Sequence, residues 1–168
     1  SYPGYDNNKM ANTVDAEYYA RLNADKSSPQ LNFATQYKAA PGSTFKIVSA
    51  TAGLMENVIN LQTKVNCVGT FTEITPSPRC WKISGHGYEN VTSAIKDSCN
   101  YFFYNVGYQL ATSSGSYNEE AGLETLSKYA DLYGLTDKSG VEIGEYAPDV
   151  STKDPVRSAI GQGSNSYT

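Results

Sequence analysis

The chain has 168 residues, of which 39% are hydrophobic and 18% charged, and its formal net charge is −4. This length suits about one domain with a sizeable core, and the balance of apolar and charged residues is typical of a folded protein rather than a disordered one. The 13 lysines and arginines are scattered without a basic run, which argues against a nucleic-acid partner, and no stretch approaches the ~20 apolar residues of a membrane span.

The first third of the chain is predicted to lead into one central helix. Residues 1–12 are rich in turn-forming residues and indicate a strand end that runs into a turn. Asp15 is a suitable N-cap for a helix over residues 15–23. Pro41 disfavours helix at the residue before it, so a second helix is expected to begin near Ser43. The body of that helix is apolar on almost every side, which predicts burial on most faces, with the serine at its exposed end.

The rest of the chain is predicted to be mainly helical. Residues 61–82 lack a helical period and indicate short strands and loops, and a glycine-flanked loop at 83–88 holds the single histidine, His86. Apolar periodicity predicts three further helices, at residues 90–96, 101–111 and 118–133. Gly134 is placed to end the last of them as a left-handed cap, and the remaining residues are expected to be rich in loops.

A hydroxyl and an amine lie three residues apart in Pro41-Gly42-Ser43-Thr44-Phe45-Lys46. Positions i and i+3 of a helix share one face, so Ser43 and Lys46 are predicted to come within hydrogen-bonding reach. A neutral Lys46 could then deprotonate Ser43, whose place in the first turn favours developing negative charge. An isolated Ser-x-x-Lys is a weak signal, because the same spacing also occurs in helices whose serine and lysine are not catalytic.

A second hydroxyl-containing cluster, Ser98-Cys99-Asn100, follows later in the chain. A Ser-x-x-Lys nucleophile motif combined with a Ser-x-Asn motif is the signature of serine penicillin-recognising enzymes. The chain resembles this family, and within it the class B penicillin-binding proteins of the cell-elongation type. Further matches to the family follow in order along nearly the whole chain, among them Arg79-Cys80-Trp81-Lys82, Gly85-His86-Gly87 and Ala159-Ile160-Gly161-Gln162-Gly163.

The resemblance implies a D,D-transpeptidase that cross-links peptidoglycan stem peptides ending in D-Ala-D-Ala and is acylated by β-lactams. It makes Ser43 the nucleophile, Lys46 the general base, Ser98 a proton relay and Asn100 a substrate-binding residue, and it implies no cofactor. It also implies a parent protein anchored at the extracytoplasmic face of the bacterial membrane, with cell-wall synthesis partners. A D,D-carboxypeptidase or β-lactamase, or a β-lactam sensor without turnover, remains an alternative because all share the nucleophile half of the site.

The implied fold is α+β: the helix-rich part of the penicillin-binding transpeptidase and β-lactamase-like fold, with only part of its antiparallel sheet. Residues 1–168 are expected to form a partial transpeptidase domain, divided into a lead-in, a nucleophile helix, a helix-rich subdomain and a connection toward further strands, at 1–42, 43–60, 61–145 and 146–168. The third motif of the family, Lys-Thr-Gly or Lys-Ser-Gly, does not follow Gly163. We therefore expect a truncated domain that is inactive or severely impaired by itself.

The three cysteines, Cys67, Cys80 and Cys99, show no Cys-x-x-Cys spacing, so no metal site is expected. Cys67 and Cys80 flank a short loop and could form a disulfide in an oxidising compartment or remain packed thiols, and the sequence leaves both open. Cys99 is expected to pack inward as a small apolar group. A structural role is predicted for His86, because a lone histidine is more often structural than catalytic. Besides their implied roles, the side chains of the Ser-x-Asn cluster could cap a helix.

Overall fold

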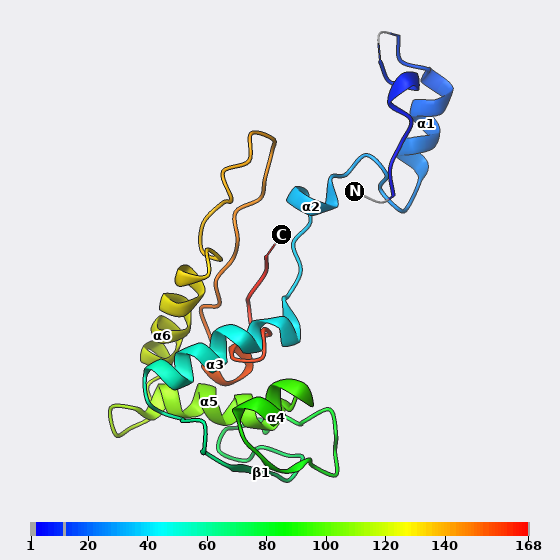
Figure 1. Cartoon of the computed structure of the whole chain (residues 1–168). Coiled ribbons are helices and arrows are strands. Elements are labelled where there is room, and N and C mark those ends of the chain that lie inside the picture. Colours follow the sequence, from blue (N-terminus) through cyan, green and yellow to red (C-terminus); the bar gives the residue numbers. More distant parts are fainter. Residues whose placement is uncertain (1–2, 12, 168) are drawn as a thin grey trace.

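The computed structural model of the chain describes residues 3–11 and 13–167. Figure 1 shows most of the helices gathered in one body, with α1 set apart from it on an N-terminal arm. No helix within the described residues is long and apolar enough to cross a membrane. In chain order the elements are η1 (Asn7–Lys9), α1 (Ala16–Ala24), α2 (Phe33–Gln36), η2 (Gly42–Phe45), α3 (Lys46–Met55), β1 (Val65–Cys67), β2 (Gly87–Glu89), α4 (Val91–Lys96), α5 (Asn100–Thr112), α6 (Glu119–Leu132) and α7 (Pro155–Ser158).

Helix α5 lies at the centre of the packing. It contacts α3, α4, α6, α7 and strand β1, and the side chains of Phe102, Phe103 and Val106 along it have no exposed surface. Buried residues at successive positions mean that the helix is covered on nearly all sides, as expected of a helix inside a core. Because α5 begins at Asn100, its most firmly packed part lies directly behind the Ser-x-Asn cluster.

Helix α3 begins where the sequence predicts, although its first turn is narrower than an α-helical turn. Residues 42–45 form the 3-10 turn η2, and the α-helix proper starts at Lys46. Most faces of α3 are buried, but Ile47 and Met55 remain 45% and 65% exposed. The predicted burial on most faces is therefore confirmed, with one side of the helix left open.

The antiparallel sheet is small. Strand β1 pairs with β2, with Val65 opposite Glu89 and Cys67 opposite Gly87. Near the end of the chain, two isolated bridges join extended segments, one from Ala39 to Tyr167 and one from Asp149 to Ser166. Helices with a small antiparallel sheet are the α+β arrangement that the sequence predicts.

Two helix-end signals that the sequence predicts, Asp15 and Gly134, are confirmed, and the structure adds a third cap at Asn90. Asp15 caps α1 by accepting hydrogen bonds from two backbone N–H groups of the first turn. Asn90 forms a capping box with Ser93 at the start of α4, and Gly134 follows α6 with a φ of +70°. The polar residues that satisfy unpaired N–H groups are thus the reason these helices begin where the sequence predicts.

Other details differ from the predictions. The strand end expected in residues 1–12 is wrong for the part described, where residues 7–9 form the 3-10 turn η1, and residues 1, 2 and 12 lie outside the described residues. The loop expected at 83–88 gives way to β2 from Gly87 onward. The one-turn helices α2 and α7 were not predicted, because four residues are too few to show a helical period.

Candidate active site

Ser43, Lys46, Ser98 and Asn100 lie in one hydrogen-bonded network. The Lys46 Nζ atom donates to Ser98 Oγ at 2.9 Å, to the Ser98 carbonyl oxygen at 2.8 Å and to Asn100 Oδ1 at 2.6 Å. The Ser98 hydroxyl in turn donates to Ser43 Oγ at 2.9 Å. The four residues named by the two sequence motifs therefore come together, and hydrogen bonds connect Ser43 to Lys46 through Ser98.

Lys46 is a buried base. Its side chain is only 2% exposed, and burial lowers its pKa from 10.5 to about 8, although ionised Cys80 and Cys99 would raise it. Burial disfavours the charged amine because the site offers no bulk water to solvate the ammonium. An amine with this pKa is partly neutral near pH 7 and can accept a proton from a hydroxyl.

Ser98 stands in a strained turn between α4 and α5. Its φ of +50° lies in the left-handed region, which residues with a Cβ atom rarely adopt. The N-cap of α5 is Cys99, without a side-chain cap bond, and Asn100 is already the first helical residue. Helix capping therefore does not explain the side chains of Ser98 and Asn100, which both bond to Lys46 instead.

The turn that carries Ser43 is held from the far end of the chain. The Gly42 N–H donates to the Gly161 carbonyl oxygen at 3.0 Å. A Cβ atom on Gly161 would lie 2.1 Å from the Gly42 carbonyl oxygen, and Gly161 has a φ of +71°. Only glycine fits this close approach without displacing the backbone next to Ser43.

The Gly161→Ala variant is therefore expected to be destabilised by about 3 kcal/mol or more, since left-handed backbone costs an alanine about 1–2 kcal/mol and the clash adds about 1–3. Gly134→Ala is the matched control, because Gly134 has a φ of +70° with no atom near its missing Cβ. Urea unfolding should show the larger loss at position 161. Equal losses at the two positions would show that the contact with Gly42 contributes nothing.

A second cluster lies directly behind the Ser-x-Asn turn. The ligand-type atoms of Cys67, Cys80, His86 and Cys99 all lie within 4.8 Å of one another, and His86 Nδ1 is 3.6 Å from the sulfur atoms of both Cys67 and Cys80. The three thiols are buried and free. Three sulfurs and one imidazole are a donor set typical of structural zinc.

The expectation of no metal site stays untested, but the structure brings together four residues that could hold a metal ion. The expectation was based on the absence of a Cys-x-x-Cys pair, but the donors come from β1, from the chain between β1 and β2, and from the turn before α5. One signal was available in the sequence, because all three cysteines and the only histidine fall between residues 67 and 99. His86, predicted to be structural, thus belongs to a group of four that can hold a metal ion.

The surroundings of Cys99 and Cys80 shift the pKa values of their thiols in opposite directions. Burial raises the pKa of the Cys99 thiol. Burial also opposes ionisation of Cys80, but backbone N–H groups of Tyr101, Lys82 and Asn100 donate to its sulfur, and its pKa is lowered overall. A bound zinc ion would displace thiol protons and would join β1, the Cys80 segment and the start of α5.

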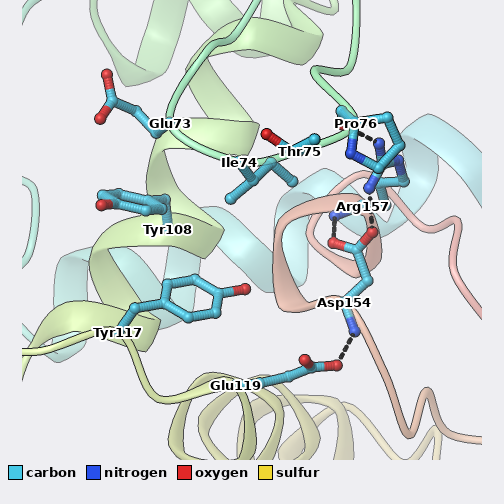
Figure 2. Close-up of a pocket in the computed structure, with 9 residues that line it drawn as sticks. All are labelled: Glu73, Ile74, Thr75, Pro76, Tyr108, Tyr117, Glu119, Asp154 and Arg157. Carbon is cyan, nitrogen blue, oxygen red and sulfur yellow. Dashed lines mark hydrogen bonds and ion pairs between the residues drawn. The ribbon is translucent and has the colours of Figure 1, made fainter.

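The cavity shown in Figure 2 lies apart from the hydroxyl–amine network. It has a volume of about 440 Å³, and none of the four network residues lines it. In it, Arg157 pairs with Asp154, whose backbone N–H donates to Glu119, while the rings of Tyr108 and Tyr117 stack. Because Ser43, Lys46, Ser98 and Asn100 lie outside this wall, the catalytic candidates are those of the Ser43 network.

A Lys-Ser-Gly triplet does occur at Lys138-Ser139-Gly140, in the loop after α6. There the Ser139 N–H donates to the Glu145 carboxylate. The hydrogen bonds of the Ser43 network involve none of these residues, so this triplet does not stand in for the third motif.

The sequence is similar to those of known proteins along most of its length. The family of the penicillin binding protein transpeptidase domain matches residues 1–168. The peptidoglycan D,D-transpeptidase MrdA of Haemophilus influenzae is 33% identical over 147 residues, which are 86% of this chain and 21% of that protein. The stage V sporulation protein D of Bacillus subtilis is 33% identical over 104 residues, 61% of this chain and 14% of that protein. The chain thus spans about a fifth of the length of the MrdA relatives.

Solved structures agree with these matches. The penicillin-binding protein PBP2 in its complex with MreC, from Helicobacter pylori, covers all of this chain with 32% of its own, at a TM-score of 0.88 and 26% identity. Penicillin-binding protein A of Mycobacterium tuberculosis, solved as an imipenem acyl-enzyme complex, covers all of this chain with 39% of its own, at a TM-score of 0.83 and 23% identity. The second likeness is evidence of a shared fold.

Proposed function

The chain belongs to the penicillin-binding protein transpeptidase family, and from that premise we propose that the protein carrying it is a peptidoglycan D,D-transpeptidase with Ser43 as nucleophile. The observation that supports this most is the hydrogen-bonded path from Ser43 Oγ through Ser98 Oγ to the buried Lys46 amine. A path of this kind lets a weakly acidic hydroxyl lose its proton as it attacks a carbonyl carbon.

The state of Lys46 determines the direction of the proton path. A charged Lys46 has three N–H donors, and the structure uses them on three acceptors, two of Ser98 and one of Asn100. A neutral Lys46 has a lone pair, which can accept the Ser98 hydroxyl proton. Ser98 Oγ is then free to accept from Ser43, so loss of one proton from Lys46 reverses both bonds of the path.

The proposed reaction has two halves. Ser43 Oγ attacks the carbonyl of the penultimate D-alanine, its proton passes through Ser98 to Lys46, and the terminal D-alanine leaves after taking a proton from the same path. The amine of a second stem peptide then attacks the acyl-enzyme, and Ser43 recovers a proton. Asn100 would orient the peptide through its amide nitrogen, because its oxygen is occupied by Lys46. A β-lactam would acylate Ser43 in place of the first peptide.

The rate of acylation by a penicillin is expected to rise with pH and to level off above about 8, the pKa of Lys46. Only the neutral amine can accept the proton, and one pH unit below its pKa about a tenth of the lysine is neutral. Rapid-quench labelling with a fluorescent penicillin between about pH 6 and pH 9 would measure this dependence. Circular dichroism at each pH provides the control for folding, and a rate that falls across this range would contradict a lysine base.

The alternatives differ in how the acyl-enzyme is resolved. A D,D-carboxypeptidase or β-lactamase would release the label by hydrolysis, a sensor would retain it without making product, and a transpeptidase would join two stem peptides. These alternatives can be distinguished by incubating the longer protein that carries this chain with a D-Ala-D-Ala donor and an amine acceptor. Cross-linked product supports the proposal, and D-alanine release without cross-links supports a carboxypeptidase instead.

The proposal extends to partners and location. The Helicobacter pylori relative was solved in complex with MreC, and we propose that the protein carrying this chain also assembles with cell-wall synthesis proteins. Its substrates, the stem peptides, lie outside the cytoplasm, so the domain is proposed to act at the extracytoplasmic face of the membrane. Co-purification with a candidate partner from cross-linked cells would test the assembly.

A further inference from the structure

The indole of Trp81 reaches the turn that carries Ser98. Its Nε1–H lies 3.2 Å from the Asp97 carbonyl oxygen and 3.1 Å from the Ser98 carbonyl oxygen. These two carbonyl groups follow the last residue of α4, where backbone oxygens lack helical partners. We propose that Trp81 is a positioning residue for the proton path, holding the Ser98 turn through its indole N–H. This inference rests on the proposed function, because it assigns Trp81 a part in that reaction.

The turn needs external support. Ser98 has a φ of +50°, and a residue with a side chain in this region carries a conformational cost that neighbouring contacts must offset. The Ser98 carbonyl oxygen accepts one hydrogen bond from Lys46 and one from Trp81. A carbonyl oxygen has two lone pairs, so these two donors satisfy it and fix the plane of the peptide that follows Ser98.

The position of the Ser98 hydroxyl depends on the same peptide. That hydroxyl must stay within hydrogen-bonding distance of both Ser43 Oγ and Lys46 Nζ. Rotation of the strained backbone toward an ordinary φ would move the Ser98 side chain away from one or both. Misplacement by about 1 Å within a reacting group can slow a reaction about a hundredfold, so a donor that prevents this rotation acts on the chemical step.

Burial does not account for Trp81. The side chain is 61% exposed, so its ring contributes little to the core, and the retained contact is the polar edge of the indole. The ring also lies against His86 in a T-shaped arrangement, with centroids 5.1 Å apart. Trp81 thus joins two parts of the site, the Cys80 segment that it follows and the Ser98 turn.

The test removes the N–H while preserving the ring. Trp81→Phe deletes the donor, and replacing Trp81 by β-(3-benzothienyl)alanine substitutes sulfur for the N–H in a ring of nearly the same shape. Tyr88→Phe is the matched control, since Tyr88 is another exposed aromatic side chain of this region, at 74% exposure. All three changes are made in the longer protein that carries this chain, and each variant is compared with the unmodified protein. The measured quantities are the acylation rate as a function of penicillin concentration, the unfolding temperature and the zinc content.

Both changes at position 81 are expected to lower the maximal acylation rate constant about tenfold or more, since positioning interactions act on the chemical step. The half-saturating penicillin concentration, the unfolding temperature and the zinc content should stay close to those of the unmodified protein, and Tyr88→Phe should match it throughout. A benzothienyl protein that acylates at the unmodified rate, or loses only affinity for the penicillin, would overturn the inference. An unmodified protein that is never acylated would instead overturn the proposed function.

Discussion

Replacing Ser43 by alanine is expected to abolish covalent labelling by a fluorescent penicillin, with a loss of about a thousandfold or more in the labelling rate. Ser43 is exposed on the first turn before α3, and its hydroxyl is the only one that both faces solvent and accepts from Ser98 in the network. Without it the proton path leads to no nucleophile. The variant should fold normally, because an exposed serine changes the free energy of unfolding by only about 0.5 kcal/mol or less.

Thr44→Ala provides the matched control for this variant. Thr44 is the adjacent exposed hydroxyl, and its only hydrogen bond in the described residues goes to the Pro41 carbonyl oxygen. In the longer protein that carries this chain, labelling followed by gel fluorescence, with the labelled peptide located by mass spectrometry, should show full reaction for Thr44→Ala and none for Ser43→Ala. Substantial labelling of the Ser43→Ala protein would remove Ser43 from its assigned role.

Removing one ligand-type residue from the cysteine–histidine cluster is expected to have the second largest effect, on stability. Cys80→Ser should lower the amount of bound zinc from about one equivalent to nearly none and lower the unfolding temperature by about 10 °C or more. The physical reason is that a metal that binds only the folded chain adds its binding free energy to folding. Ser84→Ala, in the exposed segment between Cys80 and His86, is the control and should change neither quantity.

The same prediction can be tested by visible absorption after Co²⁺ is bound to the cysteine–histidine cluster in place of zinc. Three thiolates and one imidazole around Co²⁺ form a tetrahedral site, which should give strong visible absorption that disappears on addition of a chelator. A thiol titration of the metal-free protein distinguishes the rival arrangement, since three reactive thiols are expected. Finding one thiol and no bound metal would show that Cys67 and Cys80 form a disulfide instead.

The catalytic candidates could be predicted from the sequence because each motif is local. Ser43 and Lys46 are three residues apart and Ser98 and Asn100 are two apart, so each pair can be recognised within about one turn of the chain. The direct hydrogen bond that the spacing predicts between Ser43 and Lys46 is replaced by the path through Ser98 Oγ. The distance between the two pairs could not be derived from spacing and came only from the family resemblance. The structure adds that Ser98 stands between the other two groups, because its left-handed backbone turns the hydroxyl toward Ser43.

The cysteine–histidine cluster could not be predicted from the spacing rules, for a physical reason. Those rules describe sites in which one short loop supplies two ligands, whereas Cys67 is on a strand and Cys99 precedes a helix. Only the packing of β1 against α5 brings them together. The short helices were missed for a related reason, since α7 depends on the Asp154 side chain, which accepts from the Arg157 N–H, and on contacts with α5 and α6.

Lys46 has both a structural role in the core and a proposed catalytic role. It is a buried member of α3 and also the partner of Ser98 and Asn100, so Lys46→Ala would remove a buried side chain and leave Asn100 Oδ1 without its donor, at a cost of about 1–3 kcal/mol for the lost hydrogen bond alone. Natural domains have only about 5–15 kcal/mol of stability to lose. On the proposed function, substitutions that slow acylation by a β-lactam at little cost to folding are therefore expected among the exposed neighbours of Ser43 rather than at Lys46.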